Sequence, residues 1–392
     1  MTISHAPRAG HHVVVVGAGG NIGSHLVPHL ARLPDITRLT LVDPDRYVAH
    51  NLQNQAITVA AVGRSKVHVQ ATLARRINPG ISVRAIAERV EDTPLGRLRG
   101  DVILACLDSR RSRQHVNEIA WHLGVPWIDA GVLREGMMAR IDLYVPSLAT
   151  PCLECRWDAP DYDALEQQYL CGTETVAIAG DTPSALGALA AAMQALECQQ
   201  LLASTNAAGA LAAGDQIVLA AAHHRHLRTA HRRNPHCRLA DHSVWNVEPI
   251  ELAPGDRTLG SLVDAVESRL ETGTTFSLAI AGKHFVRKVL CPGCGGLQRL
   301  LRLSRTTAAT GAACPQCRRP MVVTGFGVTE VLPASALGAP DRARLLRAIG
   351  LRDGEIVTVL TDSGRRHFEL LLAPVSARAV AATPTAALQE TA

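Results

Sequence analysis

Glycine and acidic residues near the start of the chain are spaced so that they could bind a nucleotide. A run of four valines, residues 13–16, predicts a buried strand and is followed by four glycines: Gly17, Gly19, Gly20 and Gly23. Glycines leave the backbone bare, so a phosphate can approach the free N–H groups of the helix predicted after the turn. Asp43 ends the next predicted strand, where a ribose-binding carboxylate is expected. Because Gly23 comes one residue later than in Gly-x-Gly-x-x-Gly, the turn alone fits an ATP enzyme and a nicotinamide-dependent oxidoreductase equally.

Residues farther along the chain separate these two alternatives. An enzyme that acts on the α-phosphate of ATP needs a cation on the phosphates, and Lys66 stands at the start of a predicted helix. It also needs a carboxylate that holds Mg²⁺, and Asp108 follows the apolar strand predicted over residues 101–106. A dehydrogenase has no use for this pair or for the amide-rich segment 51–55. The set therefore favours ATP over NAD.

The order of these residues resembles the superfamily of ThiF, MoeB, HesA and the ubiquitin-activating enzymes. The family's motifs in this order are the glycine loop, Asp-x-Asp, Asn-Leu-x-Arg-Gln, Gly-x-x-Lys and Asp-Asn-x-x-x-Arg, and the resemblance as a whole covers about residues 10–205. The resemblance implies ATP and Mg²⁺ as cofactors, a homodimer, and adenylation of the C-terminal carboxylate of a small ubiquitin-like or sulfur-carrier protein. Carried over motif by motif, it implies nucleotide-binding roles for the four glycines and for Asp43, Asp45, Asn51, Gln55, Lys66 and Asp108.

The chain departs from the motifs of this superfamily at two positions. Asn54 replaces the arginine of Asn-Leu-x-Arg-Gln, which removes a positive charge from the expected phosphate site. Arg46, Arg64 or an arginine of a partner subunit could restore that charge. Ser109 replaces the asparagine that follows Asp108, which is a milder change. A nucleotide-binding scaffold that has lost its chemistry is therefore the main alternative to an active adenylyltransferase.

Six of the ten cysteines form three Cys-x-x-Cys pairs, a spacing typical of metal sites. Structural zinc needs four ligands, so the first pair requires two more, and the best candidates predict the set Cys152, Cys155, Cys237 and His242. The other two pairs lie close together in sequence and predict a zinc ribbon with four thiolate ligands: Cys291, Cys294, Cys314 and Cys317. Because four ligands close the coordination sphere, both zinc ions would be structural.

Cys171 has two possible roles. Its position in the resemblance suggests the acceptor thiol that takes the activated partner protein in some family members, since a thiolate near a helix start is reactive. The alternative is a structural role, with Cys171 as a third zinc ligand beside Cys152 and Cys155.

The elements that must position these residues alternate between strand and helix over residues 13–150. This order predicts an α/β fold, a Rossmann-like and mostly parallel sheet with helices on both faces. In such sheets the ligand binds at the carboxyl ends of the strands, where the glycine turn, Asp43 and Asp108 fall. We predict a nucleotide-binding domain over residues 10–243, a C-terminal α+β region over 244–372 that carries the zinc ribbon (291–317), and a disordered tail over 373–392.

Composition excludes several other classes of protein. No stretch of about 18 apolar residues is present, and the first 12 residues lack an apolar signal-peptide core, so we expect a cytoplasmic chain with no membrane span. The net charge of +5 is small for 392 residues and gives no reason to expect nucleic acid as a partner. The basic cluster over residues 223–233 predicts a solvated loop, with a contact to an acidic partner as the alternative. The arginines around the ribbon likewise predict a solvated face.

Overall fold

The computed structural model describes residues 10–170, 182–203, 210–239, 242–304 and 313–372. The chain divides into two compact units, Met1–Trp245 and Asn246–Ala392. Two predictions, the role of Cys171 and the disordered tail over 373–392, lie outside the described residues. Each unit is described by itself below.

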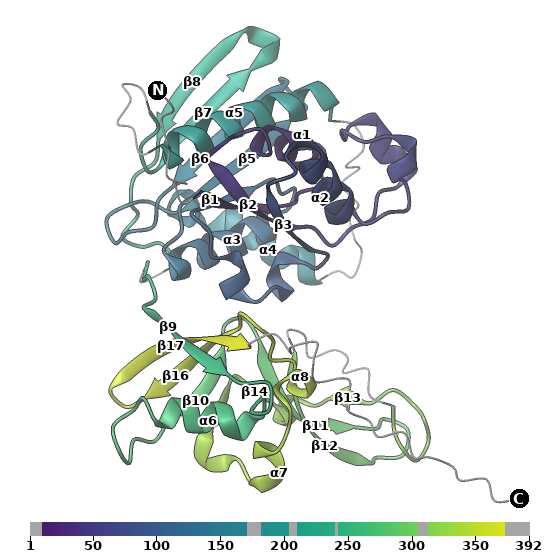
Figure 1. Ribbon diagram of the computed structural model, residues 1–392, viewed down its shortest axis with the longest axis vertical. Helices are drawn as coiled ribbons and strands as arrows, with labels where there is room; N and C mark the ends of the chain where they lie inside the picture. The colour runs from purple at the N-terminus through teal and green to yellow at the C-terminus, as the bar shows by residue number, and fades with distance from the viewer. Residues whose placement is uncertain (1–9, 171–181, 204–209, 240–241, 305–312, 373–392) are drawn as a thin grey trace, which may run out of the picture. The chain divides into compact units, whose positions relative to one another are not determined.

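The first unit is built around one large sheet. Its strands are β1 (His11–Val16), β2 (Ile36–Val42), β3 (Ser82–Ile86), β4 (Val102–Ala105), β5 (Trp127–Leu133), β6 (Met138–Tyr144), β7 (Asp215–Ala220) and β8 (Arg225–Ala230). They form an eight-stranded sheet in the order β3-β2-β1-β4-β5-β6-β7-β8 (Figure 1). Neighbours from β3 to β5 pair in parallel, whereas β6, β7 and β8 continue the sheet with antiparallel pairing.

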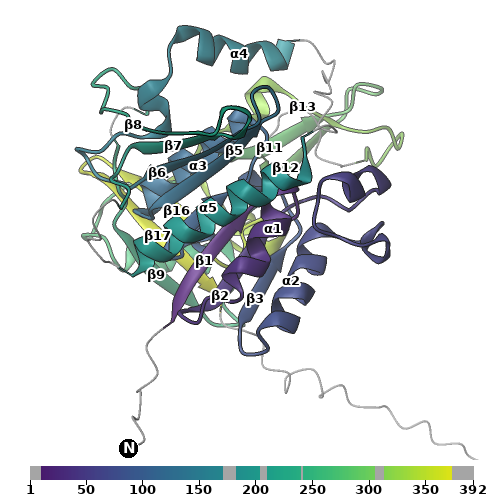
Figure 2. The ribbon, with the colours of Figure 1, turned by 90° about the horizontal axis from the view of Figure 1, so that it is seen from above.

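Helices cover both faces of this sheet. The helices of this unit are α1 (Asn21–Leu30), α2 (Lys66–Ile77), α3 (Arg110–Leu123), α4 (Ala159–Leu170) and α5 (Ser184–Leu202), of which α1, α2, α3 and α5 pack on the sheet. Helices α1, α2 and α5 share one apolar cluster with side chains of β1, β4 and β5, and α3 packs on β4 and β5 outside that cluster (Figure 2). Val13 and Val15 belong to the cluster, while Val14 and Val16 are equally buried on the other side, as expected for a central parallel strand. The prediction of a mostly parallel, Rossmann-like sheet is confirmed.

The basic cluster over residues 223–233 is not a loop throughout, so that expectation is wrong in part. Arg225–Ala230 forms strand β8, which pairs antiparallel with β7 at the edge of the sheet. All six residues of β8 are exposed, so the hydrophobic alternation that identifies a strand is absent. Strand β8 is held at the edge of the sheet by its backbone pairing with β7 and by the ion pair between Arg228 and Asp215, which lie 2.5 Å apart.

The second unit combines α and β elements, and its β11–β12 hairpin carries part of the second cysteine cluster. Its strands are β9 (Val247–Leu252), β10 (Ser277–Ile280), β11 (His284–Leu290), β12 (Leu297–Ser304), β13 (Val322–Val323), β14 (Val328–Thr329), β15 (Val331–Pro333), β16 (Ile356–Thr361) and β17 (Gly364–Leu372). Its helices are α6 (Leu259–Glu267), α7 (Ala339–Arg342) and α8 (Leu346–Ile349). One sheet has the order β15-β10-β16-β17-β9, and a smaller one joins β12, β11, β13 and β14. Among the helices of the described residues, none is both long and apolar enough to cross a membrane.

Residues 339–349 form two short helices, α7 and α8, although their sequence favours one continuous helix. Leu345 between them is extended and forms an isolated β-bridge with Thr258. The N–H groups of Leu259 and Leu346 also donate across this contact, to Arg344 and Arg257 respectively. Pairing with a segment far away in sequence therefore interrupts the helix.

Candidate functional site

A cavity of about 590 Å³ opens at the carboxyl ends of β1, β2 and β4. Among the residues that line it are eight of the predicted nucleotide-binding residues: Gly17, Gly20, Asp43, Asp45, Asn51, Gln55, Lys66 and Asp108. Gly19 and Gly23 do not line the cavity. Lys66 and Asp108, which the ATP hypothesis requires on the same side of the sheet, therefore face one cavity.

Gly19 and Gly17 are needed for close approaches within the turn. A Cβ atom on Gly19 would lie 2.3 Å from the Cβ of Lys66, so a side chain at this position would displace the lysine. Gly17 has a φ of +77°, and a Cβ there would lie 2.4 Å from the carbonyl oxygen of Cys106 at the end of β4. The glycines thus let the turn pack against both the lysine and the neighbouring strand.

Asp43 organises the turn from the end of β2. Its two carboxylate oxygens accept hydrogen bonds from the N–H groups of Gly19, at 2.9 Å, and Asp45, at 3.0 Å. Burial raises the pKa of the Asp43 carboxyl, and the Lys66 ammonium and the two N–H donors oppose that rise. Asp43 therefore connects the glycine turn to the Asp-x-Asp segment while lining the cavity.

Lys66 begins α2 with its ammonium in the cavity. Its Nζ lies 3.0 Å from Oδ2 of Asp45, and the lysine side chain is 9% exposed against 62% for the aspartate. The backbone N–H of Lys66 donates to the carbonyl of the same Asp45. The ammonium is thus held in place by an exposed carboxylate that a ligand phosphate could replace. Asp108 is exposed, and no protein partner of its carboxylate is found within the described parts of the chain.

The charge that Asn54 removes from the superfamily motif is not restored by the arginines that the sequence suggested. Arg46 donates to the carbonyl of Gly63, and neither Arg46 nor Arg64 lines the cavity. Asn54 lines it, is 6% exposed, and has no hydrogen-bond partner for its Oδ1 among the described residues. The arginines that do line the cavity are Arg89 and Arg113.

Arg113 is a site residue that the sequence analysis missed. It occupies the last position of the Asp-Asn-x-x-x-Arg motif, which was the available signal. Its Nε lies 2.9 Å from Oδ1 of the fully buried Asp129, and its guanidinium also donates to the carbonyl of Leu107. Arg140 lies 2.7 Å from the other oxygen of Asp129 and also pairs with Asp142. A buried charge network across β5 and β6 therefore holds Arg113 at the cavity.

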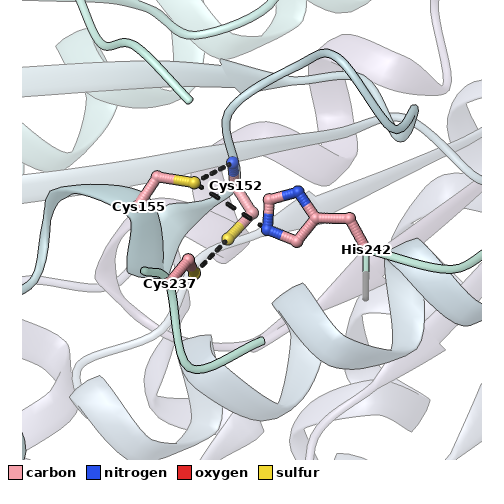
Figure 3. Close-up of side chains that lie close together, drawn as sticks. All are labelled: Cys152, Cys155, Cys237 and His242. Carbon is pink, nitrogen blue, oxygen red and sulfur yellow. Dashed lines mark hydrogen bonds between the residues drawn. The ribbon is translucent and has the colours of Figure 1, made fainter. Parts of the chain in front are cut away.

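The first predicted metal set comes together as a compact cluster (Figure 3). The ligand atoms of Cys152, Cys155, Cys237 and His242 all lie within 4.8 Å of one another, and all four residues are buried. Sγ of Cys152 is 3.6 Å from Sγ of Cys237, and Sγ of Cys155 is 3.8 Å from Nε2 of His242. Zn–S bonds of about 2.3 Å in a tetrahedron place sulfur atoms about 3.8 Å apart. The cluster therefore fits a tetrahedral zinc ion.

The loop that carries Cys152 and Cys155 is anchored to α3. The N–H of Leu153 donates to Oδ1 of Asn117, at 3.0 Å. The buried carboxylate of Glu154 accepts from Gln114 of α3, at 3.1 Å, and from Tyr162 of α4, at 2.9 Å. These bonds attach the ligand loop to α3 and α4.

The second metal set also comes together, at one end of the β11–β12 hairpin. Sγ of Cys291 lies 3.3 Å from Sγ of Cys317, and Sγ of Cys294 lies 3.6 Å from Sγ of Cys314. All four sulfur atoms are within 4.8 Å of one another, which again fits tetrahedral zinc. Desolvation raises the pKa of the Cys291 thiol, but hydrogen bonds from the N–H of Cys294, the thiol of Cys317 and the N–H of Gly293 outweigh it, so that this pKa falls below its usual value.

Comparison with known protein families identifies the family to which the first unit corresponds. The profile of the ThiF family matches residues 8–239, which is more than half of the chain. The chain belongs to the ThiF family. The resemblance inferred from the motifs is thereby confirmed, and membership of this family favours the ATP alternative over the nicotinamide one.

Proteins similar to this ThiF-family chain are named for related activities. The sulfur carrier protein ThiS adenylyltransferase of Escherichia coli is 29% identical over 193 residues, which are 48% of this chain and 71% of that protein. The SAMP-activating enzyme E1 of Haloferax volcanii is 28% identical over 194 residues, covering 48% of this chain and 66% of that one. The E. coli MccB structure with ATP matches with a TM-score of 0.47 and 23% identity, covering 59% of this chain and 66% of that one.

The matched region thus spans about two thirds of the length of these relatives. The family and the names of its curated members agree with the expected enzyme class, a nucleotidyltransferase. The second unit lies outside the family match, which ends at residue 239.

Proposed function

We propose that this ThiF-family chain is an ATP-dependent adenylyltransferase that activates the C-terminal carboxylate of a small ubiquitin-like or sulfur-carrier protein. The observation that supports this proposal most is that Lys66, Asp108 and the glycine turn line one cavity at the carboxyl ends of parallel strands. The names of the curated relatives supply the class of protein substrate. A homodimer remains a prediction from the family.

In the proposed reaction the carboxylate of the partner protein attacks the α-phosphate of ATP in line with the leaving pyrophosphate. A carboxylate–phosphorus bond forms, the bond between Pα and its bridging oxygen breaks, and the products are an acyl-adenylate and pyrophosphate. No protein group needs to gain or lose a proton in this step. The role of this chain is therefore to position both reactants and to neutralise the phosphate charge.

Each proposed role follows from the position of a side chain. Lys66 exchanges its contact with Asp45 for a phosphate of ATP, and Arg113 adds a second positive charge fixed by Asp129. Asp43, which ends β2, is the acceptor for ribose hydroxyls, and Asn51 and Gln55 line the phosphate side. Asp108 would hold Mg²⁺, because its carboxylate is exposed to the cavity and oxygen is the ligand that Mg²⁺ prefers. Mg²⁺ would supply charge neutralisation on the phosphates.

We also propose that both cysteine clusters hold structural zinc. Each offers four ligands, so no coordination position is left open for substrate. The histidine of the first cluster presents Nε2 to Cys155, which is consistent with ligation through that atom.

The test of the main proposal is ATP–pyrophosphate exchange in the presence of a candidate partner. Small β-grasp proteins that end in Gly-Gly and are encoded near this chain are the candidates. We expect exchange that depends on the partner and that falls in a Lys66→Met variant. Titration with NAD should show no binding where ATP binds. Failure to bind ATP, with the chain folded and its zinc content intact, would overturn the proposal.

A second candidate, a nucleotide-binding scaffold without chemistry, is favoured by Asn54. An Asn54→Arg variant restores the residue of the superfamily motif and separates the two functions. If the natural chain is active, its pyrophosphate exchange is measurable before the substitution. Exchange that appears only in Asn54→Arg, with equal ATP affinity in both proteins, would establish the scaffold instead.

A further inference from the structure

The positive charge of this chain is concentrated in the zinc ribbon and the segments that flank it, residues 284–329, which are together called the ribbon below. Residues 284–329 contain seven arginine and lysine residues and no aspartate or glutamate. The rest of the chain carries 33 arginine and lysine residues against 35 acidic ones, so it is slightly negative. The seven cations are Arg287, Lys288, Arg299, Arg302, Arg305, Arg318 and Arg319, of which Arg305 lies outside the described residues. A zinc ion with four thiolates has a net charge of about −2 and leaves the ribbon strongly positive.

The ribbon places like charges next to one another. Lys288 of β11 pairs directly with Arg299 of β12, and both side chains are exposed. Like charges at directly opposite positions of neighbouring strands destabilise a sheet. Keeping them therefore has a cost in stability, which a bound polyanion would offset.

The two zinc knuckles carry further exposed cations. Arg318 and Arg319 follow Cys317 directly and are exposed. Arg319 lies across the first knuckle, because a Cβ on Gly293 would be 2.6 Å from its Cδ. The strands and both knuckles thus present their cations on one small subdomain.

We propose that this zinc ribbon binds the phosphate backbone of double-stranded nucleic acid. Five of the six cations among its described residues are arginines, whose planar guanidinium groups match phosphate oxygens in bidentate pairs. Contacts of this kind to the phosphates of a duplex supply binding that does not depend on base sequence. The total net charge of +5 gave no reason to expect such a partner, because it averages a basic ribbon with a slightly acidic remainder.

The residues exposed beside the arginines favour a duplex over the other polyanions. Single strands are bound by stacking bases on aromatic side chains. Phe285 of β11 is 1% exposed, and no exposed aromatic residue is found among those of residues 284–329 whose side chains the structure describes, a set that leaves out Phe326. An acidic protein partner would be held by apolar anchors at the centre of its interface. The ribbon exposes few, chiefly Leu297 at 72% and Val322 at 38%.

The test is the salt dependence of binding, measured by fluorescence anisotropy of labelled 20-base-pair DNA and RNA duplexes with the full-length chain. A ribbon variant combines Arg299→Gln, Arg318→Gln and Arg319→Gln. The matched control combines Arg76→Gln, Arg347→Gln and Arg365→Gln, which removes three exposed charges elsewhere. Each lost phosphate contact reduces the slope of log K against log salt by about 0.9 for DNA. We expect the ribbon variant to lower that slope by roughly 2.7 and to bind more than tenfold more weakly, whereas the control keeps the natural slope.

A second ribbon variant with lysine at the same three positions retains the charge, so its slope should match that of the natural chain. Zinc content and thermal unfolding confirm that each variant is folded. The proposal is overturned if the natural chain binds neither duplex at 50 mM salt, or if the ribbon and control variants lose affinity equally. It is also overturned if the ribbon binds poly-glutamate or single strands in preference to duplexes.

Discussion

Removal of the Lys66 ammonium is the most direct perturbation of the proposed phosphate site. A hydrogen bond from a charged donor contributes about 1.5–3 kcal/mol when its partner is also charged. ATP must first displace Asp45, but that carboxylate is 62% exposed, and such pairs contribute less than about 1 kcal/mol. We therefore expect Lys66→Met to weaken ATP binding by about 1–2 kcal/mol, or roughly 5–30-fold.

Isothermal titration with ATP measures this loss, and Asp45 allows a double-mutant cycle. Asp45→Asn removes both the competitor for the lysine and a negative charge beside the phosphates, so alone it should strengthen ATP binding by about 2–5-fold. In the Lys66→Met background only the repulsion is relieved, so the same substitution should have a smaller effect. The difference between the two effects is the coupling that the 3.0 Å contact predicts.

Arg64→Met is the matched control for the loss of positive charge. Arg64 lies two residues before Lys66, is exposed and does not line the cavity, so salt screening should keep its effect on ATP affinity below about twofold. Equal ATP affinity in the natural chain and Lys66→Met, with the unfolding midpoint unchanged, would refute the assignment of the phosphates to Lys66. An equal loss of ATP affinity in Lys66→Met and Arg64→Met would show that ATP responds to the overall positive charge of the protein and not to a direct contact with Lys66.

Three other predictions concern the turn, the buried charges and the metals. Gly19→Ala should weaken ATP binding about as much as Lys66→Met, because its Cβ would displace the lysine. Gly255→Ala is the control, because a Cβ there meets open space. An unchanged ATP affinity in Gly19→Ala would contradict the assignment of the phosphates to Lys66. Asp129→Asn should lower the free energy of unfolding by about 3–5 kcal/mol in urea, because two arginines lose a buried counter-charge; a loss below 1 kcal/mol would contradict the network. Metal analysis should find two zinc ions per chain and one in each of Cys237→Ser and Cys314→Ser; two in either variant would exclude that cysteine as a ligand.

The parts of the fold that were predictable are those whose cause is local in sequence. Residues 13–16 are apolar on both faces of a strand, and only a sheet covered on both sides buries such a run. Strand β8 and the break between α7 and α8 were not predictable in this way. In β8 the pairing partner β7 decides the structure, and at Leu345 a bridge to Thr258 overrides the local preference for helix.

The same contrast between local and long-range causes applies to the candidate site. A glycine turn, a lysine at a helix start and an aspartate after a strand meet because parallel strands end at one edge, so their convergence could be inferred from the order of elements. The order of elements does not show which arginines face the cavity. The motif ending in Arg113 offered a signal for that residue, but the buried Asp129 of a neighbouring strand that holds it there could be recognised only in the structure. Arg46 and Arg64 are closer to Asn54 in sequence but lack such a counter-charge in the cavity.

Helix α3 connects the cavity with the first metal cluster. Its N-terminal end is capped by Ser109, whose side chain accepts from the N–H of Ser112, and both flank Asp108 and Arg113 at the cavity. Two turns later Asn117 of the same helix accepts the N–H of Leu153 in the ligand loop. A zinc ion in the first cluster, as proposed above, would hold the ligand loop that Asn117 joins to α3, and α3 begins beside Asp108, the carboxylate proposed to hold Mg²⁺. Loss of such a zinc ion would therefore loosen one anchor of α3 and weaken the proposed nucleotide binding without any contact between zinc and nucleotide.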